Sequence, residues 1–397
     1  MGGFVRGTNL VILLDKKKKK ILFVTGSRGE WGYIRPILRL IESSTDFEYS
    51  LCVTNMHLLP AYGMPVKEIE NDGFTVDFRV PMAIEGGDHV AMVKSLGLFL
   101  CSMSDIISSA RPDWIMLAGD RGEQLMGALA GAFVYIPVGH IQAGELSGNI
   151  DGMTRHAIGK YTHMHFASNQ DAANRLLKLG EEPFRVHNVG APQLDELVEI
   201  EPPSMQELSE KLCLDLSRPF LLVVQHATTE EVQLAQKQIE ITMRALGRLK
   251  FQNVIILPNN DAGSYLIRKG IERGRKGEFN CFANLPRMDY LGLLKEAKAI
   301  VGNSSSGLLE APTYATPAVN IGRRQNGRLR GSNVIDVPFE VEPIVQAIEK
   351  AVSSEFNKSL IDKCVNPYGD GYSASRILKI ISDTSIDSKL LTKNLTY

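Results

Sequence analysis

Side chains that transfer protons gather in one short stretch of the chain. The segment His140 to Asp151 (HIQAGELSGNID) follows an apolar run and contains Gln142 and Glu145. Neighbouring carboxyl groups shift one another's pKa, and abstraction of a proton from carbon requires a group tuned in this way. The stretch therefore predicts a proton-transfer site. A second role stays open for Glu145 and Asp151, as helix caps or as ion-pair partners of Arg155.

A further acid follows another apolar run. Asp120 and Arg121 (LAGDRGE) come directly after residues 114–118, which are predicted to form a buried strand. In open parallel sheets, ligands bind outside the carboxyl ends of the strands, so we expect Asp120 to share a cleft with the acids of the first stretch. Two roles are open for Asp120: a catalytic carboxylate, or the N-cap of the helix that follows.

The second half of the chain contains a predicted anion site. Three serines, Ser304 to Ser306 (GNSSSGLLE), follow a short apolar run and precede a predicted helix. Hydroxyl groups and the free N–H groups of a first helical turn favour a diphosphate. Glu310 would repel phosphate but is suited to accept both hydroxyls of a ribose. The segment GRRQNGR adds positive charge that would balance a diphosphate. Its arginines are Arg323, Arg324 and Arg328.

Three other strand ends carry polar residues. His226 (VVQHATTEE) is a candidate proton shuttle or phosphate donor, and Asn259 (LPNNDAGS) follows the next predicted strand. Arg28 (TGSRGEWG) is placed to face an anion, although this segment has an alternative as a purely structural turn. Its glycine spacing is G-x-x-G-x-x-G and not G-x-G-x-x-G, which disfavours an NAD-dependent dehydrogenase.

Short apolar runs alternate with helical segments along the whole chain, and this alternation must position the residues above. Such an alternation predicts parallel strands covered by helices on both faces, a doubly wound α/β sheet. The predicted strands are 21–25, 49–54, 114–118, 134–138, 186–189, 220–225, 254–257, 299–301, 318–321 and 333–337. The predicted helices are 34–41, 89–108, 123–132, 230–249, 265–273, 289–297, 307–315 and 341–353.

The length of 397 residues exceeds the usual limit for one hydrophobic core, so we expect two domains. An acidic stretch with two prolines, residues 196–203, is the best candidate for a boundary. We therefore predict a Rossmann-like domain over 16–198 with the acids and a second over 199–370 with the anion site, separated by a cleft.

Composition limits the partners and the compartment. The 44 lysines and arginines nearly cancel the 45 aspartates and glutamates, which gives no reason to expect nucleic acid or a membrane as partner. The five cysteines are scattered without a C-x-x-C pair, as is typical of a reducing compartment, so we expect a cytoplasmic protein. The basic tract 16–20 follows an apolar run that is too short to span a bilayer.

Eight motifs in order resemble one enzyme family. They are similar to motifs of the hydrolysing UDP-N-acetylglucosamine 2-epimerases of sialic acid biosynthesis and of their legionaminic-pathway relatives. The eight segments are TGSRGEWG, GDR, HIQAGELSGNIDGMTRHAIGK, VGAPQLDEL, QHATTEE, PNNDAGS, GNSSSGLLEAPTYATPAVNIGRRQNGR and YGDG. The resemblance implies the GT-B fold, in which two Rossmann-like domains clasp a nucleotide sugar and a last helix, here 371–384, crosses back onto the first domain.

The resemblance also implies roles for individual residues. The matches near the diphosphate are Arg28 and Arg121. The matches that hold the nucleotide are Asn259, Ser304, Ser305, Glu310 and Arg324. The matches linked with catalysis are Asp120, Asp151 and His226. Family members eliminate the nucleoside diphosphate across C1 and C2 of the sugar and then add water to the glycal, with no metal or redox cofactor. The family likeness further implies a homo-oligomer, a dimer or a tetramer.

One departure from the family pattern concerns Gln142, because well-known members carry a carboxylate at this position. An amide cannot act as a base. Either Asp120 and Asp151 transfer the protons while Gln142 orients substrate or water, or Glu145 substitutes for the missing acid. A hydrolysing epimerase is the main hypothesis. A non-hydrolysing epimerase, a GT-B glycosyltransferase and a nucleotide-sugar sensor without catalytic activity are the alternatives.

Overall fold

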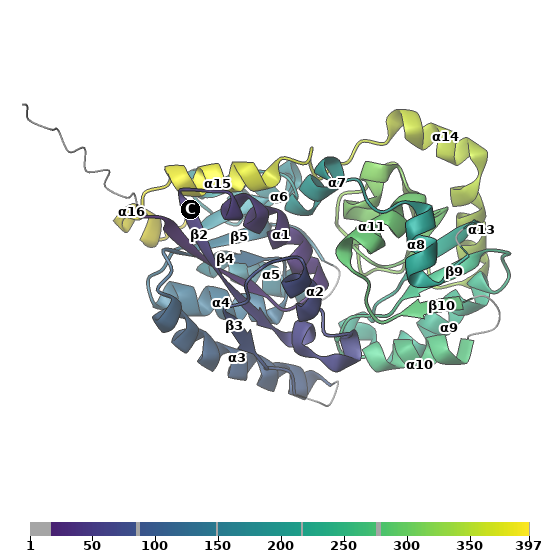
Figure 1. Cartoon of the computed structure of the whole chain (residues 1–397), viewed down its shortest axis with the longest axis horizontal. Coiled ribbons are helices and arrows are strands. Elements are labelled where there is room, and N and C mark those ends of the chain that lie inside the picture. The colour runs from purple at the N-terminus through teal and green to yellow at the C-terminus, as the bar shows by residue number, and fades with distance from the viewer. Residues whose placement is uncertain (1–16, 85–87, 148–149, 216, 275–278, 397) are drawn as a thin grey trace, which may run out of the picture.

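Two parallel β-sheets, each covered by helices on both faces, form two domains that lie side by side (Figure 1). The computed structural model describes residues 17–84, 88–147, 150–215, 217–274 and 279–396. All strand pairs in both sheets are parallel. The predicted α/β class and doubly wound architecture are confirmed.

The N-terminal sheet has the order β3-β2-β1-β4-β5-β6-β7. Its strands are β1 Lys19–Thr25, β2 Phe47–Thr54, β3 Phe78–Val80, β4 Trp114–Ala118, β5 Val138–Ala143, β6 Met164–Ala167 and β7 Val186–Asn188. Strand β1 is apolar throughout because alternate residues enter two cores: Ile21 and Phe23 pack on one face, Leu22 and Val24 on the other.

Among the described residues of this half of the chain, seven segments are α-helices. They are α1 Arg28–Glu42, α2 Val66–Asn71, α3 His89–Ala110, α4 Gly122–Phe133, α5 Ile150–Tyr161, α6 Gln170–Lys178 and α7 Asp195–Glu199. Among the described residues, α3 alone has the length and hydropathy of a membrane span. Its buried face, which includes Phe99 and Met103, packs in the core beside β1 and β4. This helix thus serves as a layer of the domain.

The C-terminal sheet has the order β10-β9-β8-β11-β12-β13, which repeats the arrangement of the first sheet. Its strands are β8 Phe220–Val224, β9 Gln252–Ile256, β10 Phe279–Phe282, β11 Ala299–Gly302, β12 Ala318–Ile321 and β13 Val334–Val337. Its helices are α8 Met205–Leu212, α9 Ala235–Leu246, α10 Ser264–Gly274, α11 Arg287–Glu296, α12 Ser306–Leu309, α13 Val341–Val352 and α14 Ser354–Lys363.

The end of the chain returns to the first domain. Helix α15, Ser373–Asp383, lies along α1, and the short helix α16, Ser388–Leu391, follows it (Figure 1). Ile377 and Ile381 of α15 belong to the same core as Ile34 and Ile37 of α1. Asp195 in the linker accepts hydrogen bonds from the backbone N–H groups of Ser373 and Ala374 at the start of α15. The two domains are therefore joined by two crossings of the chain.

Three predicted elements differ from the structure. The helix expected at 230–249 is a 3-10 turn, Thr229–Leu234, followed by the shorter α9. The strand expected at 134–138 is instead β5, Val138–Ala143, because α4 runs on to Phe133 and the apolar residues after it form an exposed turn before Pro137. The helix expected at 307–315 is only the four-residue α12, followed by a 3-10 turn, Ala311–Tyr314. Pro312 has no N–H to donate and so cannot extend an α-helix.

Candidate active site

The candidate site is a cavity in the cleft between the domains. It lies where the strand order of each sheet reverses, beside the loops that follow β1, β4, β8 and β11. Open α/β sheets bind their ligands at this kind of position. The empty volume is about 1280 Å³, counting the open space at the mouth.

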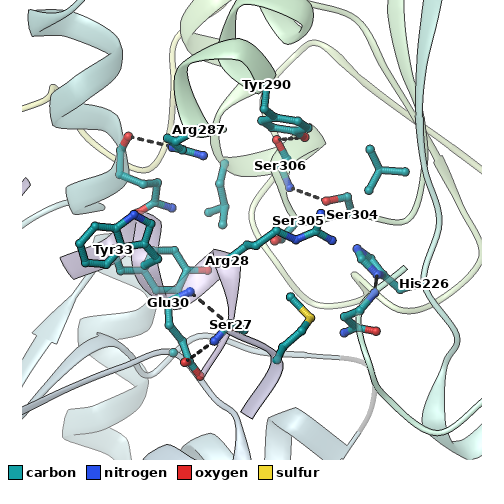
Figure 2. Close-up of a pocket in the computed structure, with 18 of the residues that line it drawn as sticks. Ser27, Arg28, Glu30, Tyr33, His226, Arg287, Tyr290, Ser304, Ser305 and Ser306 are labelled. Atoms are coloured by element: carbon teal, nitrogen blue, oxygen red, sulfur yellow. Dashed lines mark hydrogen bonds between the residues drawn. The ribbon is translucent and has the colours of Figure 1, made fainter. Parts of the chain in front are cut away.

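Arg28 presents a positive charge at the start of α1. Ser27 and Glu30 form a capping box, in which Glu30 Oε2 accepts from Ser27 N at 3.1 Å and fixes the first turn (Figure 2). Arg28 donates to Asn284 Oδ1 at 3.2 Å and to the carbonyl of Leu257 at 3.2 Å, both across the cleft. Within the described ranges, no carboxylate lies within ion-pair distance of its guanidinium. The charge of Arg28 is therefore available to an anion in the cavity.

Three serines on the opposite wall complete the anion site. Ser304, Ser305 and Ser306 all line the cavity, and Figure 2 shows them facing Arg28. Ser306 Oγ accepts from the hydroxyl of Tyr290 at 2.7 Å, and Ser306 N donates to Ser304 Oγ at 3.3 Å. Because α12 is a single turn, the hydroxyls and local N–H groups carry more of the predicted anion affinity than a helix dipole does.

Glu310 is neutralised by a partner that the sequence did not indicate. Arg287 at the start of α11 lies 2.6 Å from Glu310 Oε1, and both residues line the cavity. Burial works against the charge of Arg287, but Glu310 and Glu196 raise its pKa. The pairing removes the repulsion that an isolated Glu310 would exert on a phosphate. It leaves Glu310 Oε2, which accepts from Ser306, on the side of the serines.

Asp120 is held as a carboxylate by two arginines. Arg155 of α5 and Arg328 of the other domain both bond to Asp120 Oδ2, the latter at 3.4 Å, and Ser147 donates to the same oxygen at 3.1 Å. Burial alone would raise the pKa of Asp120, but Arg155, Arg328 and Arg324 hold it below its usual value. The sequence offered Arg155 as a partner of Glu145 or Asp151, and the structure pairs it with Asp120.

Asp151 in the first turn of α5 differs from Asp120 in its protonation. Burial and the nearby carboxylates of Asp120 and Asp261 raise the pKa of Asp151 to about 7, against the opposing effect of Arg324 and Arg121. Arg324 Nη2 lies 3.9 Å from Asp151 Oδ2. Asp151 lines the cavity. It therefore offers a carboxyl group that exchanges a proton near neutral pH, as proton transfer to or from carbon requires.

The raised pKa of Asp151 predicts a pH-dependent stability. A carboxyl group with a pKa of about 7 in the folded state and about 4 when unfolded binds protons preferentially in the folded state between these values. Its contribution to stability is present at low pH and is lost as pH rises through 7. The asparagine in the variant Asp151→Asn does not titrate. We therefore expect the free energy of unfolding of the native chain to fall, relative to that of the variant, as the pH rises from 5 to 8. Urea unfolding at both values tests this, and parallel changes in the two proteins would contradict it.

His226 is a neutral hydrogen-bond donor in this structure. Its Nδ1 accepts from the backbone N–H of Asn259 at 3.2 Å, so a neutral ring carries its proton on Nε2. Burial, with Arg324 and Arg28 nearby, lowers the pKa of His226 well below its usual value. Asn303 fixes the backbone on both sides, accepting from His226 N at 2.7 Å and donating to His226 O at 2.9 Å. Of the two predicted roles, donation to a phosphate fits this geometry.

Arg121 ties the two domains together. It lies 2.9 Å from Asp261 Oδ1 across the cleft and 3.3 Å from Glu123 Oε1 in its own domain. Asn259 Nδ2 donates to the other oxygen of Asp261 at 2.5 Å. Both Arg121 and Asn259 line the cavity. Their side chains are engaged with Asp261, so Arg28 supplies more free positive charge for an anion than Arg121 does.

Gln142 and Glu145 lie outside the cavity lining. Glu145 is buried, and its Oε1 is occupied by hydrogen bonds from Ser168 and Asn169, which follow β6. Glu145 is thus not placed to substitute for the acid that Gln142 lacks. Gln142 lies in a bulge of β5 with φ of 63° and reaches the cavity only through Gln193, whose Oε1 accepts from Gln142 Nε2 at 3.2 Å.

Comparisons with known proteins find several relatives whose names describe a 2-epimerase. A family model described as UDP-N-acetylglucosamine 2-epimerase matches residues 39–382. A Legionella pneumophila protein named UDP-N,N'-diacetylbacillosamine 2-epimerase (hydrolyzing) is 34% identical over 380 residues, covering 96% of this chain and all of that one. A Campylobacter jejuni protein named GDP/UDP-N,N'-diacetylbacillosamine 2-epimerase (hydrolyzing) is 35% identical over 347 residues, covering 86% and 90%.

A solved structure shares the fold. The Neisseria meningitidis UDP-GlcNAc 2-epimerase bound to UDP-GlcNAc superposes with a TM-score of 0.78 at 18% identity, over 92% of this chain and 100% of that one. The match supports the GT-B arrangement of two parallel-sheet domains around a cleft.

Proposed function

This chain belongs to the UDP-N-acetylglucosamine 2-epimerase family, and we propose that it is a hydrolysing nucleotide-sugar 2-epimerase. Its substrate is UDP-N-acetylglucosamine or a diacetamido relative carried by UDP or GDP. Its products are the free 2-epimeric sugar and the nucleoside diphosphate, as in sialic- or legionaminic-type acid biosynthesis. The observation that carries the proposal is a cavity that is lined both by Arg28 with three serines and by Asp151, a carboxyl group with a pKa of about 7.

The first half of the reaction breaks the bond to the diphosphate. Arg28, the hydroxyls of Ser304 and Ser305 and the Nε2–H of His226 would hold the diphosphate and stabilise the charge that develops as it leaves. Ionised Asp151 would take the proton from C2 as the C1–O bond breaks, which gives a glycal and the nucleoside diphosphate. A base whose pKa lies near the working pH is the most effective for this transfer.

The second half adds water to the glycal. A proton from solvent would add to C2 on the face opposite to the one that lost hydrogen, which inverts C2 and leaves positive charge at C1. Asp120, kept ionised by Arg155 and Arg328, would then accept a proton from the water that adds to C1 and return it to solvent. The proton taken by Asp151 returns to solvent, so substrate plus water gives sugar plus diphosphate and the enzyme is regenerated. The new hydrogen at C2 comes from water.

Product analysis in D₂O tests this function. We expect mass spectrometry to find a free 2-acetamido sugar with one deuterium at C2, and one nucleoside diphosphate per sugar. Intact nucleotide sugar with altered C2 would identify a non-hydrolysing epimerase instead. Transfer to an acceptor with C2 hydrogen retained would identify a glycosyltransferase, and binding without turnover a sensor. A panel of UDP- and GDP-linked sugars identifies the substrate.

Arg28→Met is expected to weaken the binding of UDP. The variant removes a guanidinium without a carboxylate partner, and hydrogen bonds to charged groups contribute about 1.5–3 kcal/mol, which corresponds to a loss of about 10- to 150-fold. Isothermal titration with UDP measures the effect. Arg79→Met is the control, because Arg79 is exposed and pairs with Glu70 far from the cavity. Equal UDP affinity in Arg28→Met and the native chain would contradict the anion site.

The family likeness also leads us to propose a cytoplasmic homo-oligomer that needs no metal or cofactor. Among the described residues, exposed apolar side chains on α3, at the end of α4 and just after α4 support self-association. They are Val93, Leu98, Phe133 and Tyr135. Light scattering after gel filtration would measure the state, and turnover in EDTA would test the requirement for metal.

A further inference from the structure

The amide of Gln193 is a buried donor with an open position beside the cavity. Gln193 lies in the 3-10 turn Pro192–Leu194, is 1% exposed and lines the cavity. Its Oε1 accepts from Gln142 Nε2 at 3.2 Å. Its Nε2 has no hydrogen-bond partner among the described residues. A buried N–H group without an acceptor costs about 1–3 kcal/mol, so a ligand that supplies an acceptor at this point of the cavity would remove that cost.

Gln142 determines which end of that amide faces the cavity. Gln142 is 2% exposed, and its carbonyl accepts from Arg155, which anchors the bulge of β5 next to β4 and Asp120. Because the Gln142 amide donates to Gln193 Oε1, the Nε2 of Gln193 is turned away from it. A carboxylate at position 142 can only accept. It would rotate the Gln193 amide and turn its carbonyl oxygen toward the cavity.

The chemistry of the neighbouring wall selects the acceptor. Arg28 and the serines already supply the donors for a diphosphate, whereas Gln193 is linked to Asp120 through Gln142 and Arg155. The backbone carbonyl of Gln193 also accepts from Arg287, whose charge Glu310 neutralises. A neutral amide donor placed here suits a neutral acceptor better than a phosphate, which the charged groups already attract. An acetamido carbonyl is such an acceptor, and its hydrogen bond to a buried amide is geometrically specific.

We propose that Gln193 binds the carbonyl oxygen of an acetamido group on the sugar, and that Gln142 is a positioning residue that keeps the Gln193 donor directed at it. This inference rests on the proposed function, since it takes the ligand to be a nucleotide-linked acetamido sugar. It gives the departure from the family's carboxylate a role in substrate recognition.

Steady-state kinetics of Gln193 and Gln142 variants test the proposal. We expect Gln193→Leu and the near-isosteric Gln193→Glu to lower kcat/KM by about 10- to 100-fold, as expected for loss of a buried hydrogen bond, with inhibition by UDP unchanged. Gln142→Glu should cause a similar loss although it restores a carboxylate. Equal losses with UDP-N-acetylglucosamine and a UDP-diacetamido sugar identify the C2 acetamido group. A loss confined to the second sugar identifies the C4 group.

The controls separate folding, function and recognition. Gln206→Leu on exposed α8 should behave as the native chain, and unchanged UDP inhibition shows that each variant is folded. Native kcat/KM in both Gln193 variants, or higher turnover in Gln142→Glu, would overturn the inference. If the native chain turns over neither sugar, the proposed function fails. The ratio of nucleotide-sugar to UDP affinity then tests Gln193 by itself, and an equal ratio in native and variant chains would reject it.

Discussion

Asp151→Asn is expected to lower kcat by about 10²- to 10⁴-fold, the range that general acid–base catalysis contributes. Asparagine keeps the size of the side chain but cannot accept a proton. UDP affinity should change little, because Arg28 and the serines, which we assign to the anion, lie elsewhere on the cavity wall. Stopped-time product analysis measures kcat and titration measures UDP binding. Asp105→Asn is the matched control, because Asp105 is an exposed residue of α3.

The same variant should change the pH profile. With a pKa of about 7, Asp151 is protonated at acid pH and cannot act as the base, so native kcat should fall as pH drops through 7. A residual activity of Asp151→Asn should lack this limb. Near-native kcat, or an acid limb that persists in the variant, would assign the C2 proton to another group.

Much of the fold could be predicted because its strands are continuous apolar runs. The strand predicted at 114–118 is β4 with the same bounds, and the helix predicted at 123–132 follows it as α4. The exception at β5 has a physical cause. His140 and Gln142 are polar yet buried in a strand between two others, where His140 Nε2 bonds to the carbonyl of Gly119 at 2.6 Å and Gln142 bonds to Gln193. Periodicity in the sequence cannot reveal such partners.

The candidate site could be predicted as a set of strand ends but not as a network of contacts. The resemblance and the strand ends led to Arg28, Asp120, Asp151 and the serines, all of which line the cavity. Arg287 and Gln193 were missed as site residues because each is defined by its tertiary partner. The signal present was weak: Arg287 follows a strand and opens a helix, as Arg28 does.

Charged side chains of the two domains meet across the cleft, so the relative position of the domains affects the pKa values of Asp120 and Asp151. Asp120 contacts Arg328 from the second domain, and Arg324 approaches Asp151 in the first. Separation of the domains would remove both arginines from the acids, so the pKa values that suit the reaction belong to the closed arrangement. The ion pair between Arg121 of the first domain and Asp261 of the second, 2.9 Å apart, also holds the domains in this arrangement.

Asp120→Asn is expected to abolish turnover and also to destabilise the protein, unlike Asp151→Asn. Arg155 and Arg328 are 3% and 9% exposed at their side chains, and the variant leaves both without a charged partner. Removing one member of a buried ion pair costs about 3–5 kcal/mol. Urea unfolding at pH 7.5 measures this loss, and UDP titration under native conditions verifies that the site is intact.

A double-mutant cycle shows whether the cost comes from the stranded arginines. Adding Arg328→Met to Asp120→Asn should restore part of the lost stability, because the methionine removes one unpaired charge, while turnover stays absent because the carboxylate is still missing. Arg248→Met, at an exposed arginine that pairs with Glu342, should restore nothing. If Asp120→Asn unfolds like the native chain, Asp120 does not hold the two arginines. If it retains turnover, water is activated by a different group and the second half of the proposed reaction must be reassigned.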